Sequence, residues 1–128
     1  MKIVVLIARI LLGLMFFVFG LNKFHEFIPS GPLPSGVAGQ FLGAMISTKY
    51  MMIVGTFETI GGLLLLVNRF VPLALCLLGP VIVNILIVGI LMSPQALGSG
   101  LVVTALWLIL FVRFRPAFAG IFQARLSN

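Results

Sequence analysis

Residues 50 to 67 read YMMIVGTFETIGGLLLLV, an apolar stretch with a single carboxyl group, Glu58, at its middle. As a helix, this stretch is about 27 Å long, close to the thickness of the hydrocarbon core of a bilayer. A carboxylate at that depth costs at least a few kcal/mol unless it is paired, hydrated or protonated. We therefore expect polar groups from neighbouring spans to gather around Glu58.

Composition places the chain among membrane proteins. Of its 128 residues, 62% are hydrophobic and 8% are charged, and the mean hydropathy is +1.32. The length predicts one membrane domain over residues 1–128. The net charge of +6 does not indicate nucleic-acid binding, because the sequence has no basic stripe with interleaved aromatic residues. The lone Cys76 excludes an internal disulfide.

Apolar runs separated by turn residues predict four membrane spans. The segment before the second span, VAGQFLGAMIST, is too short to cross a bilayer, so it is expected to be an interfacial or re-entrant helix. We thus predict an all-α integral membrane protein, an antiparallel four-helix bundle with this short helix between spans 1 and 2. The predicted spans are residues 3–24, 50–67, 70–92 and 97–114, and the short helix covers residues 37–48.

Orientation is predicted from the basic residues. With four spans, one side of the membrane receives Lys2, Arg9, Arg69, Arg113, Arg115 and Arg125, and the other receives Lys23 and Lys49. Six against two favours cytoplasmic placement of both termini. The expected location is the bacterial cytoplasmic (inner) membrane.

Helical spacing brings small residues and polar residues together on the first two spans. In span 1, one face carries Arg9, Gly13, Phe16, Gly20 and Lys23. In span 2, one face carries Met51, Gly55, Glu58 and Gly62. Glycines beside the acid allow a neighbouring backbone to approach closely. These stripes favour packing of the spans into one bundle.

Depth counting selects the candidate site. Counted from the outer ends of their spans, Glu58 and Asn84 lie about 13 Å and about 12 Å deep, and Thr104 and Trp107 lie at about 10 to 15 Å. We predict a polar pocket that opens outward and includes Asn22, Lys23, Glu58, Asn84, Thr104 and Trp107.

Two states of Glu58 are open at this point. An unpaired Glu58 is expected to be protonated, whereas an ionised pair requires Lys23 to reach it. We expect the Lys23 ammonium to reach Glu58 if span 2 begins a turn earlier or if the proline-rich loop packs inward. The competing interpretation is that Glu58 and Asn84 are inert interhelical contacts.

The remaining motifs exclude several chemistries. His25 beside Glu26 is interpreted as a loop pair, since a metal site needs three or four ligands. A lone histidine argues against a bis-histidine haem. The sequence contains no phosphate-binding loop, dinucleotide or flavin fingerprint, Ser-His-Asp set or metal motif.

Four segments resemble the DoxX family of small bacterial membrane proteins: GLNKF at 20–24, FETIGGLLLL at 57–66, NRFVPLAL at 68–75 and PVIVNILIVGI at 80–90. The resemblance implies four helices and maps the family's polar positions onto Asn22, Lys23, Glu58 and Asn84. Many relatives carry a histidine after the amide of span 3, but residues 85–90 contain none here. The family takes its name from a subunit associated with thiosulfate:quinone oxidoreduction, and some members are linked to oxidative-stress complexes.

The resemblance implies a membrane subunit or partner of an oxidoreductase system. A quinone would then bind near Glu58 and Trp107, and a soluble redox protein would be a partner alongside the lipid bilayer. Two alternatives stay open: a structural or assembly role, and a small-solute or proton pathway. The outward apolar area also leaves a homo-oligomer open, and the sequence identifies neither an enzymatic activity nor a substrate.

Overall fold

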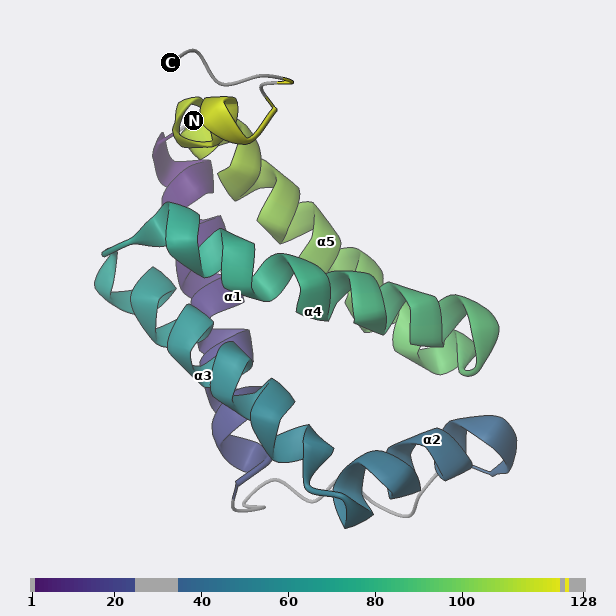
Figure 1. The fold of residues 1–128 in the computed structure, drawn as a ribbon. Helices are drawn as coiled ribbons and strands as arrows, with labels where there is room; N and C mark the ends of the chain where they lie inside the picture. The colour runs from purple at the N-terminus through teal and green to yellow at the C-terminus, as the bar shows by residue number, and fades with distance from the viewer. Residues whose placement is uncertain (1, 25–34, 123, 125–128) are drawn as a thin grey trace.

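The computed structural model describes residues 2–24, 35–122 and 124, and it is helical throughout them, with no strand (Figure 1). The fold class predicted from the sequence is confirmed, including the short helix between spans 1 and 2. Four of the described helices are long and apolar enough to cross a membrane. The proline-rich loop, with His25 and Glu26, lies outside the described residues. The elements are α1 (Lys2–Asn22), α2 (Gly36–Ser47), α3 (Tyr50–Val67), α4 (Val71–Leu91), α5 (Pro94–Phe114) and the 3₁₀ helix η1 (Arg115–Phe122).

α1 and α3 run antiparallel, and their predicted stripes meet. The buried residues of α1 include Gly13, Phe16 and Gly20, and those of α3 include Gly55, Glu58 and Gly62. Gly13 lies against Gly62, and Gly20 lies against Gly55, so the two helices cross in a single register. We call this contact the α1–α3 seam.

Glycine is required in the seam because the two backbones touch. A Cβ atom on Gly62 would lie 2.4 Å from the Phe17 amide nitrogen and 2.6 Å from the Gly13 carbonyl oxygen. A Cβ atom on Gly20 would lie 2.6 Å from the Thr59 amide nitrogen. Lipid tails are as apolar as leucine, so close backbone packing of this kind is a main source of helix association in a membrane.

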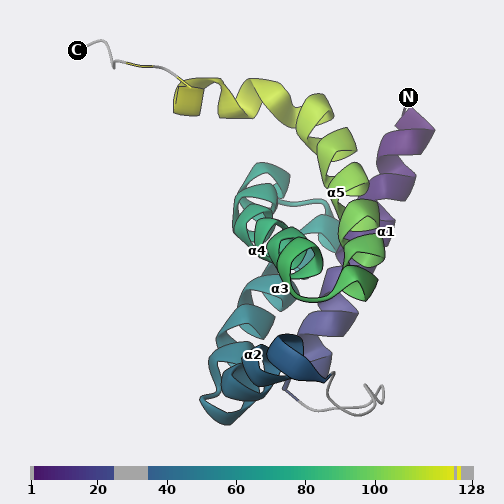
Figure 2. The same ribbon diagram turned by 90° about the vertical axis from the view of Figure 1, so that its right-hand side faces the viewer.

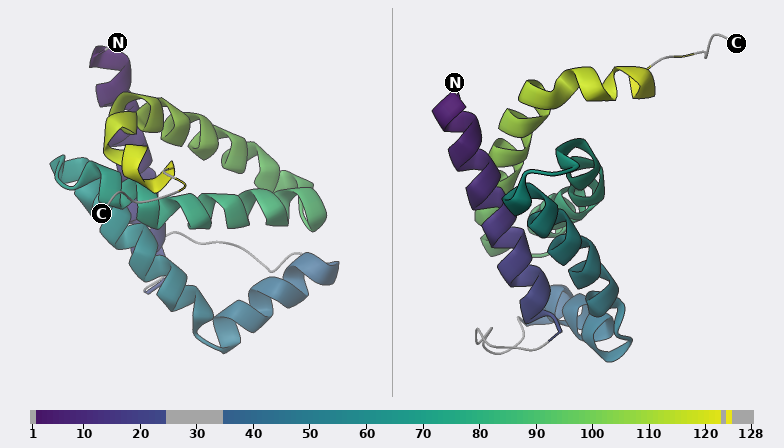
Figure 3. Two further views of the ribbon diagram at one scale, coloured as in Figure 1. Left: turned by 45° about the horizontal axis from the view of Figure 1, so that its top comes forward. Right: turned by 90° about the vertical axis from the view of Figure 1, so that its left-hand side faces the viewer.

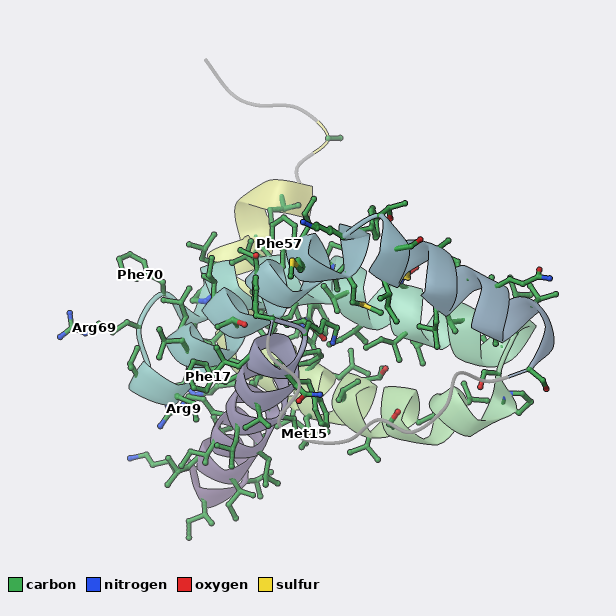
Figure 4. All side chains as sticks on the ribbon, turned by 90° about the horizontal axis from the view of Figure 1, so that it is seen from below. Arg9, Met15, Phe17, Phe57, Arg69 and Phe70 are labelled. Carbon is green, nitrogen blue, oxygen red and sulfur yellow. The ribbon has the colours of Figure 1, made fainter. Side chains whose placement is uncertain are left out.

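Arg9 contacts α3 at the other end of the α1–α3 seam. Its guanidinium donates to the carbonyl of Leu65 and, at 3.3 Å, to that of Leu66, in the last turn of α3. These carbonyls lie where a helix has unsatisfied acceptors and a partial negative charge. Arg9 thus stabilises the C-terminus of α3. Beyond it, Arg69 and Phe70 project outward from the α3–α4 turn (Figure 4).

α4 and α5 form the second pair. Gly89 admits the backbone of Leu97 near their turn, because a Cβ atom there would lie 2.9 Å from the Leu97 Cα. Further along, the Trp107 indole nitrogen donates to the Leu75 carbonyl at 3.0 Å. Pro80 lies inside α4, which nonetheless continues to Leu91.

Aromatic stacking holds η1 against the end of α5. Trp107 stacks on Phe111 with a centroid distance of 5.2 Å, and Phe111 contacts the buried Phe118 at 5.1 Å. From Arg115 onward the chain turns away from the α5 axis (Figure 2). η1 lies at the same end of the molecule as the first turn of α1 (Figure 1).

The two helix pairs splay apart instead of forming four parallel rods. α1 and α3 share one side of the molecule, while the far ends of α4 and α5 extend away from them (Figure 1). α2 meets α3 in a V at the turn around Thr48 and Lys49 and extends in the same direction as α4 (Figure 3). The space bounded by α2, α3 and α4 contains the candidate site.

Candidate functional site

Glu58 forms an ion pair with Lys23. The Lys23 Nζ lies 2.6 Å from the Glu58 Oε1, which is a short charge-assisted contact. Glu58 is only 3% exposed, whereas the Lys23 side chain keeps 22% of its surface accessible. The only buried charged residue in the described part of the chain is therefore paired, and the pair is reachable through its lysine.

The α1–α3 seam explains how Lys23 reaches Glu58. α3 begins at Tyr50, as predicted, so no earlier start of the helix is needed. Lys23 follows the end of α1, and its aliphatic stem lies across Gly55, where a Cβ atom would lie 3.0 Å from the Lys23 Cβ and 3.3 Å from its Cδ. The glycine leaves room for the stem to run along α3 to Glu58, one turn further on.

A cavity of about 250 Å³ lies beside this pair. All five α-helices contribute to its wall, which is largely apolar. The polar lining side chains are Lys23, Glu58, Asn84 and Ser99, and the methionines are Met15, Met45 and Met51, with Phe16, Phe19 and Phe41 among the aromatic residues. Small-molecule sites typically combine such an apolar wall with a few polar groups.

A second cavity, of about 370 Å³, borders the first on the α2 side. The two cavities share Phe41, Met45 and Asn84 as lining residues. Asn84 itself is exposed, and its side chain borders both. Ala44, Thr48 and Tyr50 complete the described part of the second wall, and none of the described lining residues is charged.

The structure brings three of the six predicted site residues to one cavity. Lys23, Glu58 and Asn84 line it. Asn22 is half-buried at the end of α1 and does not line it.

The two predicted residues of α5 lie away from this cavity. The Thr104 hydroxyl donates to the Gly100 carbonyl of its own helix at 2.6 Å. Trp107 donates to the backbone of α4 and packs in the hydrophobic core. Depth alone grouped them with Glu58, but the direction in which a helix faces its neighbours depends on the packing.

Sequence reasoning missed the contribution of α2. Phe41, Leu42 and Met45 line the first cavity, and none of them is among the site residues predicted from the sequence. Their spacing of three and four residues does mark one helical face. Nothing in that spacing indicates whether the face covers a cavity or lipid.

Chemically, the site offers hydrogen-bond donors in an apolar surround. A lysine ammonium has three donor hydrogens, and the contact with Glu58 uses one of them on a partly exposed group. The Asn84 amide provides both a donor and an acceptor. An apolar molecule that carries carbonyl oxygens matches this arrangement.

The comparisons with known proteins now identify the class of membrane protein. The family model DoxX matches residues 4–90, so the chain belongs to the DoxX family. The matched region contains Lys23, Glu58 and Asn84 and ends before α5. No curated protein and no solved structure is detectably similar to the chain.

Proposed function

We propose that this DoxX-family membrane protein binds a quinone in the cavity beside Glu58 and serves as a membrane subunit or partner of an oxidoreductase system. The observation that supports the proposal most strongly is the Lys23–Glu58 ion pair in the wall of a largely apolar cavity of about 250 Å³. A purely structural contact would not need to border an open space.

The cavity suits the ring of a quinone in size and chemistry. A dry apolar cavity of about 150 Å³ holds benzene, so the larger space here accommodates one substituted ring. Lys23 can donate to one carbonyl oxygen of the ring, and Asn84 can donate to another polar group. Phenylalanine and methionine side chains supply the apolar contacts. The electrons for reduction would come from the partner oxidoreductase, and a protonated ammonium beside the ring would stabilise developing negative charge.

We further propose that the protein lies in the bacterial cytoplasmic membrane with both termini in the cytoplasm. The basic residues divide six against two between the ends of the spans. In this orientation, the site lies in the outer half of the bilayer. A reporter that is active only in the cytoplasm should be active when it is fused to either terminus. Activity of a periplasm-specific reporter fused to the C-terminus would contradict this orientation.

Ring binding is the direct test. The protein in nanodiscs is titrated with ubiquinone-0, a tailless benzoquinone, and compared with empty nanodiscs by calorimetry. We expect saturable binding that weakens at least about tenfold in the double variant Lys23→Met, Glu58→Gln. The double variant removes both charges and so avoids leaving one buried charge alone. Thr104→Val, which alters a hydroxyl outside the cavity, is the matched control. Absence of saturable binding to the wild type would overturn the proposal.

A structural role is the second candidate, because Glu58 is already paired and the pair connects the end of α1 to α3 beside the α1–α3 seam. In that case the pair would serve only to hold two helices together. The double variant then lowers the thermal stability while ubiquinone-0 binds neither protein.

A further inference from the structure

The second cavity has no role in ring binding, yet it borders the site through three shared lining residues. We propose that it is the subsite for the hydrocarbon tail of the ligand, and that the ligand enters sideways from the bilayer between α2 and α4. The inference rests on the proposed function and names the substrate class: a lipid-dissolved amphiphile with a carbonyl-bearing ring and a tail, in place of a water-soluble solute.

Adjacency of the two cavities is the first argument. Phe41, Met45 and Asn84 belong to both walls, so a ring bound beside Lys23 would have the second cavity next to it. A polar head beside the ion pair and a tail in the second cavity fit this adjacency.

The chemistry of the second wall is the next argument. None of its described lining residues is charged, and the Thr48 hydroxyl donates within the chain, to the Ala44 carbonyl at 2.6 Å. A charged solute would find no counter-charge among these described residues, whereas a hydrocarbon tail can lie against Phe41, Ala44 and Met45.

The position of α2 gives the route. α2 packs chiefly against α3, and its described buried residues are only Ala38 and Met45. Apolar side chains of the same helix are widely exposed, with Val37 at 62% and Ile46 at 56%. α2 leaves one end of α3 and α4 leaves the other, and both extend to the same side of the molecule (Figures 1 and 3). Residues of α2 and α4 both line the second cavity, and the surroundings of these helices in a membrane are lipid.

Blocking the second cavity tests the proposal. Ala44 is exposed and lines only the second cavity, so Ala44→Trp fills that space from a position able to accept a larger side chain. Ala44→Phe is a smaller version of the same block. Ala105→Trp, at an exposed position of α5 that lines neither cavity, is the matched control.

Each protein in nanodiscs is titrated with ubiquinone-0 and with decylubiquinone, which has the same ring and a ten-carbon tail. The tail contribution is the ratio of the two dissociation constants, and partition into lipid is the same for every variant because the nanodiscs are the same. We expect Ala44→Trp to reduce the tail contribution at least about tenfold relative to the wild type while ring affinity changes less than about twofold. Ala44→Phe should show a smaller loss, and Ala105→Trp none.

The outcomes separate the two proposals. Normal ring binding with an unchanged tail contribution in Ala44→Trp overturns the tail subsite and leaves the proposed function standing. An equal loss of affinity for ubiquinone-0 and decylubiquinone in Ala44→Trp also overturns the tail subsite. If native mass spectrometry shows a smaller oligomer for Ala44→Trp than for the wild type, the second cavity is the contact site of another copy of the chain. That outcome excludes a tail there. Failure of the wild type to bind ubiquinone-0 overturns both proposals.

Discussion

The α1–α3 seam and the space beneath α2 both belong to membrane-type apolar helices, yet they pack in opposite ways. The seam brings backbones into contact through Gly13, Gly20, Gly55 and Gly62. The space beneath α2 is lined by methionine and aromatic side chains and retains open volume. Glycine has no side chain to adapt, whereas methionine has three rotatable bonds. The comparison indicates a rigid seam that positions the ion pair and an adaptable wall that would face the proposed ligand.

The largest effect is expected where the two regions meet, at the ion pair. Lys23→Met leaves the Glu58 carboxyl group buried without its cationic partner, and breaking one side of a buried pair costs about 3 to 5 kcal/mol. The double variant Lys23→Met, Glu58→Gln should recover most of that loss, because it removes the second charge as well. Thermal unfolding in one detergent compares the three proteins. If the single variant is as stable as the wild type, the ion pair does not hold the seam.

The seam itself should be intolerant of a single methyl group. Gly62→Ala places a Cβ atom 2.4 Å from the backbone of Phe17, and overpacking of this kind costs about 1 to 3 kcal/mol. Gly98→Ala is the control, because a Cβ atom on Gly98 meets nothing within 4 Å. Alanine is the better helix former, so this control should unfold at an equal or higher temperature. Equal stability of the two variants would mean that the backbones are not in contact.

A loss of comparable size is expected at the far end of the seam. Arg9→Met removes the guanidinium that donates to the last turn of α3, and hydrogen bonds of a charged donor contribute about 1.5 to 3 kcal/mol. Arg69→Met removes an exposed arginine from the same end of the molecule and should change the unfolding temperature little. Similar losses in both variants would point to a general effect of charge at this end instead of a contact with α3.

The smallest effect is expected in the cavity wall. Met51→Leu conserves volume and should cost less than about 1.5 kcal/mol, since volume-conserving exchanges are tolerated even in closed cores. The same exchange should alter ubiquinone-0 affinity more than stability, because leucine cannot adjust its shape to the ring as methionine does. Unfolding curves and calorimetric titrations on one preparation provide both values. A stability loss as large as that of Gly62→Ala would remove the distinction between the two regions.

The spans and their stripes could be predicted because they depend on local properties. Hydropathy and length identify a span wherever it packs, and helical spacing puts Gly55, Glu58 and Gly62 on one face in any fold. Even the similar depth of Glu58 and Asn84 follows from counting residues at a constant rise. For the same reason the family resemblance, which depends on short segments in order, was evident in the sequence and confirmed by the family model.

The packing of the helices determined the features of the site that counting residues along each helix could not predict. Lys23 reaches Glu58 because the glycines of the seam let α1 lie close enough for its stem to cross Gly55. Trp107 and Thr104, at a suitable depth, turn toward backbone carbonyls and leave the cavity to Val103 and Ser99. α2 is too short to cross the membrane. It covers the second cavity because of the angle between α2 and α3. Depth is a one-dimensional property of each helix, whereas a site requires the rotation and tilt of several helices, which depend on contacts between residues far apart in the chain.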